Sequence, residues 1–272
     1  MINENIMIEV SLNDLKKISL GILESIHQFC IDNNIKYSLA YGTLIGAVRH
    51  TGFIPWDDDI DIIMPRIDYE RFIRTYNNGQ NVYRVVDISI DDSYPYAFAK
   101  VEDSRTIKNE LGYDKIGVCI DVFPMDNFPD SIKKGDKHFR AYRRMRNLQD
   151  IKNMKWRKGR SWYKNLFLYV SKFLLLGYPL RKMIKESNKI SQQYNEAKTN
   201  KLFSFVGGSY GRKEIVPNNI FDNIIELEFE GKCFNATANY DELLTILYGD
   251  YMQLPPGEKR VTHHNFQAYW KD

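Results

Sequence analysis

The chain has 272 residues, of which 43% are hydrophobic and 27% are charged, and its formal net charge is +3. These values are typical of a globular protein that buries a sizeable core, and the length allows one large domain or two small ones. The sequence contains neither an internal repeat nor a low-complexity linker.

The sequence indicates a cytoplasmic protein. The first ten residues lack the basic segment and apolar run of a signal peptide. The most apolar stretch, residues 166–180, contains Lys172 and Pro179 and is too short and too interrupted to span a bilayer. Three cysteines lie far apart without any metal-binding spacing, which favours a reducing compartment.

The first half of the chain alternates between helical and strand periodicity. Apolar residues at helical spacing after Ser11 predict a helix at 11–30. Alternation of Asp and Ile predicts a strand at 59–62, with Asp59 and Asp61 on one face. Further helices are expected at 43–50 and 68–76, and further strands at 36–41, 82–90, 96–102 and 116–123.

The second half begins with a different composition. Residues 131–200 are basic, helical in period and free of strand signals, whereas a short helix at 240–248 and a proline-containing loop follow near the end. These elements predict an α+β fold with a mixed sheet, flanking helices and a helical insertion. We expect a catalytic core in residues 1–130, a basic helical region in 131–200, and a C-terminal part, 201–272, that completes the catalytic domain.

Positive charge is concentrated in one segment. Residues 133–164 contain 13 Lys or Arg and two Asp, and the apolar stretch 166–180 follows directly. An interfacial helix combines these two features, so residues 133–180 predict peripheral contact with the inner face of the plasma membrane. A helical lid with a charged outer face and a buried inner face explains them equally well. Nucleic acid is not expected, because no binding motif for it is present.

Three carboxylates form the principal candidate site. Asp59 and Asp61 repel each other unless a cation neutralises them, and Asp121 lies near the end of a later apolar strand. Oxygen ligands of this kind favour Mg²⁺ or Mn²⁺, the ions that assist phosphoryl and nucleotidyl transfer. A solvated acidic surface is disfavoured by the interleaved isoleucines. A calcium loop is disfavoured because Ile62 holds its glycine position.

A glycine turn precedes these carboxylates. Gly42 and Thr43 open a short helix after a strand, where free backbone N–H groups and the helix dipole favour an anion such as phosphate. Arg49 and His50 end this helix and are candidates for contact with the same phosphate. The alternatives are an ordinary strand-to-helix turn and charges that interact with the helix dipole.

Residues 41–72, YGTLIGAVRHTGFIPWDDDIDIIMPRIDYERF, resemble the signature of the LicD family. That family includes bacterial phosphorylcholine transferases and is related to fukutin and fukutin-related proteins. Segments 99–106, 120–129 and 249–264 also match, so the resemblance covers nearly the whole chain and is weakest in the helical region.

The resemblance implies a nucleotidyltransferase-like fold and assigns roles to individual residues. Asp59 and Asp61 match the metal ligands, and Asp121 matches the third carboxylate, which is also placed to act as a base. Lys100 matches a lysine that neutralises donor phosphate. The spacing of 15 residues between Thr43 and Asp59 exceeds the usual superfamily pattern. Arg260 and His263 fall in a C-terminal motif that either binds substrate or holds the loop.

The function implied by the resemblance is metal-dependent transfer of a phosphorylated alcohol, with phosphocholine favoured. The donor is CDP-activated, and the acceptor is a sugar of a glycan, lipid-linked glycan, lipopolysaccharide, capsule or teichoic acid precursor. Nucleotidyl transfer on the same fold and a non-catalytic, membrane-associated scaffold are the alternatives. A choline donor requires an aromatic cage, for which Trp56, Tyr37 and Tyr41 are candidates.

Overall fold

The computed structural model describes residues 8–79, 82–110, 113–154, 159–204, 210–261 and 267–271. Its α-helices are α1 (Leu12–Asp32), α2 (Tyr41–His50), α3 (Arg66–Thr75), α4 (Ile132–Asn153), α5 (Trp162–Leu174), α6 (Leu180–Ser191) and α7 (Tyr240–Tyr248). Its strands are β1 (Ser38–Leu39), β2 (Asp61–Pro65), β3 (Tyr83–Val86), β4 (Ala99–Asp103), β5 (Thr106–Glu110), β6 (Tyr113–Ile116), β7 (Cys119–Phe128), β8 (Lys201–Ser204), β9 (Ile215–Pro217), β10 (Ile224–Phe229), β11 (Lys232–Thr237) and β12 (Ala268–Trp270). Short 3-10 turns occur at Tyr76–Asn78, Gln192–Tyr194, Gly211–Glu214, Asn218–Phe221 and Gly257–Lys259.

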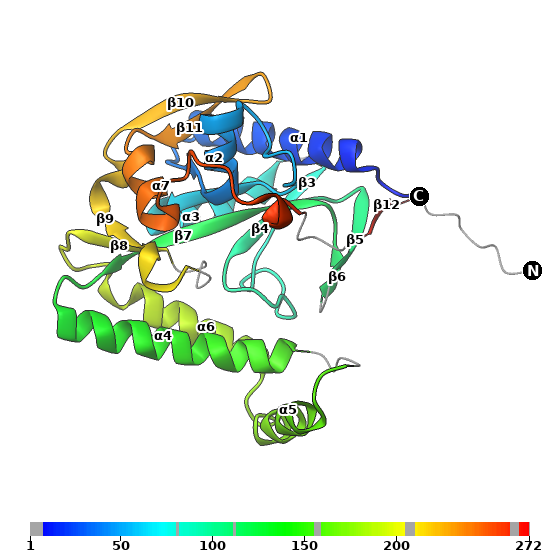
Figure 1. The fold of residues 1–272 in the computed structure, drawn as a ribbon, viewed down its shortest axis with the longest axis vertical. Coiled ribbons are helices and arrows are strands. Elements are labelled where there is room, and N and C mark those ends of the chain that lie inside the picture. The colour runs from blue at the N-terminus through cyan, green and yellow to red at the C-terminus, as the bar shows by residue number, and fades with distance from the viewer. Residues whose placement is uncertain are drawn as a thin grey trace, which may run out of the picture.

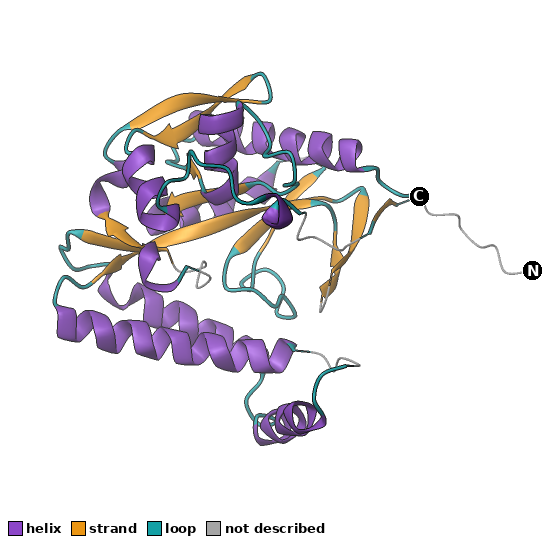
Figure 2. Ribbon diagram, viewed as in Figure 1, coloured by secondary structure: helices purple, strands orange, loops and turns teal. Residues whose placement is uncertain are grey.

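A mixed sheet forms the centre of the fold. Its strand order is β1-β2-β7-β4-β3, and β8 pairs with the far end of β7 and with β9. Strand β7 runs parallel to β2 and antiparallel to β4 and β8. Strand β7 therefore joins the N-terminal strands to those that follow the helical region, and helices flank the sheet (Figures 1 and 2).

Smaller elements extend this arrangement. The antiparallel hairpin of β10 and β11 lies against α2, and β12 closes a three-stranded sheet with β5 and β6. In α1, the Ser11 side chain accepts a hydrogen bond from the Asp14 amide, and apolar residues at helical spacing face the core. One large cluster of buried side chains contains Ile22 and Ile26 of α1, Ile62 of β2 and Val122 of β7.

The basic helical region lies below the sheet in Figure 1, with α4 and α6 side by side and α5 projecting beyond them. Buried Gln149 of α4 donates from Nε2 to the Ser187 hydroxyl of α6 at 2.9 Å. Tyr142 of α4 belongs to the large core cluster, while Ile184 of α6 joins a second cluster with Tyr94. Helices α4 and α6 therefore pack on the sheet domain as well as on each other.

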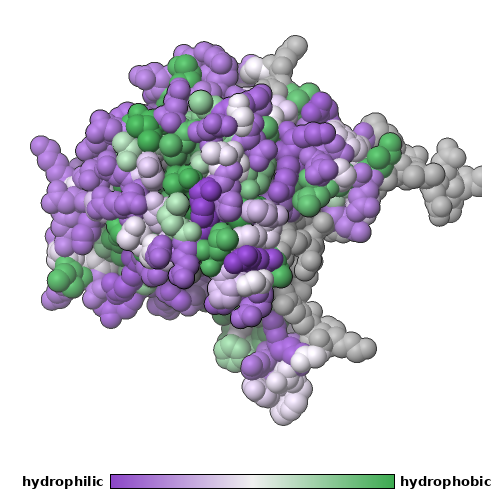
Figure 3. Space-filling model, turned by 45° about the horizontal axis from the view of Figure 1, so that its top comes forward, coloured by the Kyte–Doolittle hydropathy of each residue, from purple (hydrophilic) through white to green (hydrophobic). Residues whose placement is uncertain are grey.

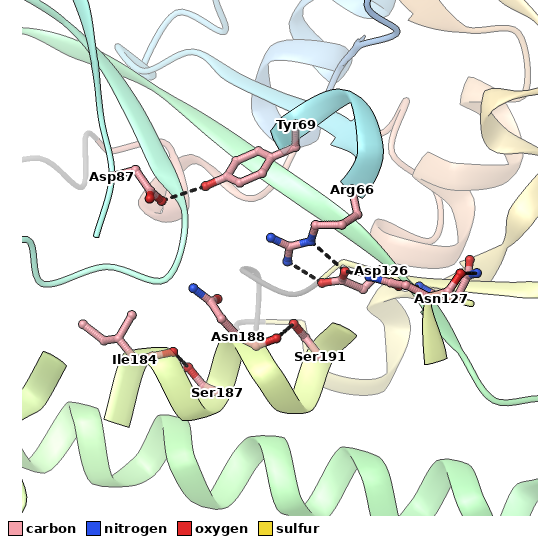
Figure 4. Close-up of polar contacts among 10 residues, drawn as sticks. Arg66, Tyr69, Asp87, Asp126, Asn127, Ile184, Ser187, Asn188 and Ser191 are labelled. Atoms are coloured by element: carbon pink, nitrogen blue, oxygen red, sulfur yellow. Dashed lines mark hydrogen bonds and ion pairs between the residues drawn. The ribbon is translucent and has the colours of Figure 1, made fainter. Parts of the chain in front are cut away.

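A buried ion pair lies where α3 and β7 meet this helical region (Figure 4). Arg66 donates from Nε and Nη2 to the two carboxylate oxygens of Asp126 at 2.8 and 2.6 Å. Asn195, which follows α6, donates from Nδ2 to Asp126 at 2.7 Å and accepts from the Asn127 amide at 2.8 Å. These polar contacts fix the junction in one orientation, because a buried charge is tolerated only with its partners in place.

The α+β class is confirmed, and most predicted elements occur near their expected positions. The predicted start of the strand at 59–62 is wrong. Strand β2 begins at Asp61, and residues 57–60 have no regular structure. Strand β7 extends five residues past the expected end at 123. The sheet of β5, β6 and β12 is absent from the predicted elements, since its strands are short and β12 pairs with β5 across more than half of the chain.

We expect Asp126→Asn to lower the free energy of unfolding by about 3–5 kcal/mol, because it leaves the buried Arg66 charge without its carboxylate. Urea denaturation followed by circular dichroism measures this loss. The matched control is Glu70→Gln, which removes an exposed ion pair with Arg74 (Oε2–Nη2 3.7 Å) and should cost less than about 1 kcal/mol. Equal losses in both variants would contradict a special role for the buried pair.

Candidate active site

Three charged residues form a row across three neighbouring strands. In the sheet register, Asp61 of β2 pairs with Asp121 of β7, and Asp121 pairs with Lys100 of β4. Residues paired directly across strands project from the same face, so the three side chains lie next to one another. Two carboxylates and one ammonium group therefore face the same side of the sheet.

Lys100 is bound tightly within this row. Its side chain is 6% exposed, and its Nζ lies 2.5 Å from Oδ1 of Asp121. The same ammonium lies 5.0 Å from the Tyr96 ring centroid and 5.3 Å from that of Phe98, within the range of cation–π attraction. The Lys100 ammonium therefore partly compensates the carboxylates beside it.

Burial and mutual repulsion act on the carboxylates. Burial raises the pKa of Asp61 well above its usual value, and Asp59, Asp121 and Asp57 raise it further. Burial also raises the pKa of Asp121, although Lys100 opposes this shift. Negative charge is therefore incompletely balanced among these carboxylates, and a cation would favour their ionised forms.

These residues open into a cavity of about 1130 Å³, which Asp57, Asp59, Asp61 and Asp121 all line. Asp57 and Asp59 enter it from the irregular segment before β2 rather than from a strand. Asp57 is not among the candidate residues predicted from sequence, and the structure adds it to the carboxylates that line the cavity.

The glycine turn lies beside the carboxylates. Gly42 lines the cavity, and a Cβ at this position would lie 2.6 Å from Oδ2 of Asp57, so a larger residue would displace that carboxylate. Thr43 is 3% exposed and does not line the cavity. Its hydroxyl instead accepts a hydrogen bond from the Asp61 amide at 2.8 Å. Thr43 is thus placed to position β2, behind the cavity wall.

Two arginines, Arg49 and Arg260, also line the cavity. Arg49 donates from Nη1 to the Tyr251 carbonyl at 2.5 Å, and Arg260 donates from Nε to the Pro255 carbonyl at 2.7 Å. Burial lowers the pKa of Arg49, and the nearby charge of Arg260 lowers it further. Within the described part of the chain, neither guanidinium makes an ion pair with a carboxylate. Two adjacent, uncompensated cations form a favourable site for an anion.

The remaining predicted residues have different surroundings. Trp56 lines the cavity, and the Arg260 guanidinium lies 5.6 Å from its ring centroid. His50 accepts from Nε of Arg49 at 3.0 Å but does not line the cavity. His263 lies outside the described residues. The prediction that Tyr37 belongs to an aromatic cage is wrong. Tyr37 is fully buried, and its hydroxyl forms a hydrogen bond with Nδ1 of His27 at 2.6 Å.

An aromatic wall lies close to the carboxylates. It consists of Tyr41, Phe98, Phe123, Tyr210 and Tyr248, which all line the cavity. Tyr41 stacks on Tyr210 with centroids 6.0 Å apart, while Phe123 lies 5.4 Å from Tyr41 and 4.8 Å from Phe98. Tyr41 adopts a left-handed backbone conformation, with φ at 48°. Sequence reasoning found only Tyr41, because the other rings come from distant segments.

Arg146 is a further residue that the sequence analysis did not single out. It belongs to α4, yet its side chain lines the cavity together with the carboxylates. Burial lowers the pKa of Arg146 but its contacts with Tyr142 and Asp150 raise it, and the net shift is upward. The basic helical region thus contributes a permanent cation to the cavity.

The donor set fits a divalent cation that shares its coordination with a substrate. All four carboxylates supply oxygen, the ligand type preferred by Mg²⁺ and Mn²⁺. Within the described ranges, no three His, Cys, Asp or Glu side chains are arranged as a complete metal-ligand group. Mg²⁺ is commonly held by one or two carboxylates together with water and substrate phosphates. The repulsion among these carboxylates is the observation that favours such an ion.

The chain is similar to known proteins. The family model for the LicD/FKTN/FKRP nucleotidyltransferase domain matches residues 34–160. The lipopolysaccharide cholinephosphotransferase LicD of Haemophilus influenzae is 33% identical over 269 residues, covering 97% of this chain and 99% of that protein. An uncharacterised protein of Rickettsia prowazekii is 33% identical over 81 residues, 25% of this chain and 30% of that protein. A second uncharacterised protein, from Rickettsia typhi, is 48% identical over 52 residues, which are 19% of this chain and 17% of that protein.

We expect Thr43→Val to lower the free energy of unfolding by about 1–3 kcal/mol, because it leaves the Asp61 amide without its buried acceptor. Thr43→Ser keeps the hydroxyl and serves as the matched control, with a loss expected to be smaller. Thermal and urea denaturation of both variants measure the difference. Equal stability of Thr43→Val and Thr43→Ser would show that the hydrogen bond to the Asp61 amide does not hold β2 in place.

Proposed function

Because the chain belongs to the LicD family, we propose that it transfers phosphocholine from a CDP-activated donor to a sugar hydroxyl of a cell-surface glycan precursor. The Haemophilus relative, named a lipopolysaccharide cholinephosphotransferase, aligns over nearly all of both chains. The observation in the structure that supports this proposal is a single cavity lined both by the carboxylates and by Arg49 and Arg260, which form no ion pair within the described residues.

The guanidinium groups of the cavity suit the donor's phosphates. Arg49 and Arg260 carry charge that no described carboxylate neutralises, and Arg146 lines the same cavity. Guanidinium groups pair well with phosphate oxygens, since their N–H donors match phosphate geometry. We infer that these three arginines hold the diphosphate, while Lys100 stays beside Asp121.

The carboxylates around Asp61 suit a metal ion and a base. We propose that Asp59 and Asp61, with Asp57 beside them, hold Mg²⁺ or Mn²⁺, which would neutralise charge on the reacting phosphate. Asp121 completes the site and takes the proton of the acceptor hydroxyl. The acceptor oxygen then bonds to the phosphorus that carries the alcohol, the bond from that phosphorus to the CMP oxygen breaks, and CMP leaves.

The aromatic wall favours choline among the possible alcohols. A quaternary ammonium has no N–H to donate and is instead attracted to the faces of aromatic rings. Tyr41, Tyr210 and Tyr248 present such rings near Asp61, whereas one face of Trp56 is already covered by Arg260. Glycerol and ribitol carry hydroxyl groups and no positive charge, so an aromatic wall attracts them less strongly than it attracts choline.

Nucleotidyl transfer is the second candidate, because the matching family model describes a nucleotidyltransferase domain. The two reactions differ in which phosphorus is attacked and therefore in their products. Transfer of the phosphorylated alcohol releases CMP from a CDP-alcohol, whereas nucleotidyl transfer releases pyrophosphate from CTP.

The reaction can be assigned by incubating the protein and Mg²⁺ or Mn²⁺ with CDP-choline, CDP-glycerol, CDP-ribitol or CTP, with and without a glycan acceptor. We expect CMP release from CDP-choline. We expect Asp121→Asn to slow it by about 100- to 10 000-fold, because the base is lost. The control is Asp68→Asn on α3, which pairs at 3.4 Å with exposed Arg71. Pyrophosphate from CTP would assign nucleotidyl transfer, and an unaffected Asp121→Asn would exclude Asp121 as base.

We expect Tyr210→Leu to raise the KM for CDP-choline by roughly 30-fold, the equivalent of about 2 kcal/mol of cation–π attraction. Its KM for CDP-glycerol should change far less, because glycerol has no cation to lose. Tyr210→Phe keeps the ring and is the matched control, with an almost unchanged KM. An equal increase in KM for CDP-choline and CDP-glycerol would show that the aromatic wall does not recognise the choline headgroup.

A further inference from the structure

Helix α5 is apolar on the side that faces away from the protein. Trp162 is 77% exposed, Phe173 71% and Leu174 76%, and five more residues of the helix are also exposed: Tyr163, Leu166, Phe167, Tyr169 and Val170. The only buried residues of the helix are Asn165 and Leu168. A contiguous apolar surface of this kind is unusual in water and marks an interaction site.

The positions of these residues follow the helical repeat. Tyr163, Phe167, Val170 and Leu174 recur at intervals of three or four and therefore lie along one stripe of the helix. Asn165 and Leu168 lie on the opposite face. The helix projects below α4 and away from the main body (Figures 1 and 3). The four side chains of the stripe are 49–76% exposed, so no described segment covers them. Helix α5 therefore does not form the alternative considered from sequence, a lid with a buried apolar inner face.

Charge indicates what covers this stripe. Residues 151–185 contain ten Lys or Arg and no Asp or Glu. A second copy of the chain placed on α5 would bring two such basic segments together, and their repulsion opposes a dimer. An anionic lipid surface instead attracts the basic residues and accepts the apolar side chains.

We propose that α5 and its basic flanks dock the protein on an anionic membrane surface, with the helix lying parallel to the bilayer plane. Trp162, Tyr163 and Tyr169 suit the headgroup level, where aromatic rings with a polar edge are enriched. Among the described helices, none is long and apolar enough to cross a membrane. Arg146, on the neighbouring helix α4, lines the cavity, so α5 connects membrane docking to a helix of the active site.

Flotation of the full-length protein with vesicles tests this proposal. We expect binding to vesicles of phosphatidylcholine with about one third phosphatidylglycerol, and at least roughly tenfold weaker binding to phosphatidylcholine alone. Binding should weaken as salt rises, since salt screens the attraction between the basic residues and the lipid. The Trp162 emission should shift to the blue on binding, and Trp162→Phe should remove that shift.

The double variant Phe173→Glu/Leu174→Glu should reduce binding to anionic vesicles by roughly tenfold or more, because it places one charge in the apolar stripe and a second on the exposed apolar surface beside it. The matched control is Ile67→Glu on α3, a residue 75% exposed but remote from α5, which should bind like the unchanged protein. Circular dichroism must show that both variants remain folded.

Three results would overturn the proposal. The first is the absence of binding to anionic vesicles, and the second is undiminished binding of the double variant. The third is a dimer in light scattering that the double variant dissociates, without any vesicle binding, which would make a second copy the partner. These readouts need no catalysis, so membrane docking stands or fails separately from phosphocholine transfer.

Discussion

The parallel pairing of β2 with β7 is the constraint on which the site depends. It places Asp61 opposite Asp121, and the antiparallel pairing of β4 adds Lys100 on the other side. A shift of one residue in either pairing would turn the paired side chain to the opposite face of the sheet. Thr43 binds the Asp61 amide at the start of β2, so the glycine turn also contributes to this register.

Sequence reasoning could predict the local parts of this arrangement. The helix with Ser11 at its start and the helix Tyr240–Tyr248 follow from periodicity and capping, which neighbouring residues determine. The segment 41–72 carries the family resemblance, and it holds Gly42, Arg49 and three of the carboxylates, all of which line one cavity. The start of β2 was misjudged, because alternation of Asp and Ile resembles a strand even where no partner strand is available.

Long-range contacts could not be predicted in the same way. Tyr210 and Tyr248 reach the cavity from segments that follow the helical region, and Arg146 reaches it from within that region. No local periodicity distinguishes these residues from other aromatic or basic side chains. The pairing of Arg66 with Asp126 is equally invisible in sequence, since 60 residues separate the partners and only the packing of α3 on β7 joins them.

Tyr41 combines two demands that oppose each other. Its left-handed backbone, with φ at 48°, is one that glycine adopts freely and that costs other residues about 1–2 kcal/mol. Its ring, however, stacks on Tyr210 in the cavity wall. Glycine would relieve the backbone strain at this position, but it would lose the ring, which is buried in the core cluster and contacts Phe123 as well as Tyr210. The first residue of α2 therefore marks a trade-off in which local conformational stability is sacrificed to the shape of the cavity.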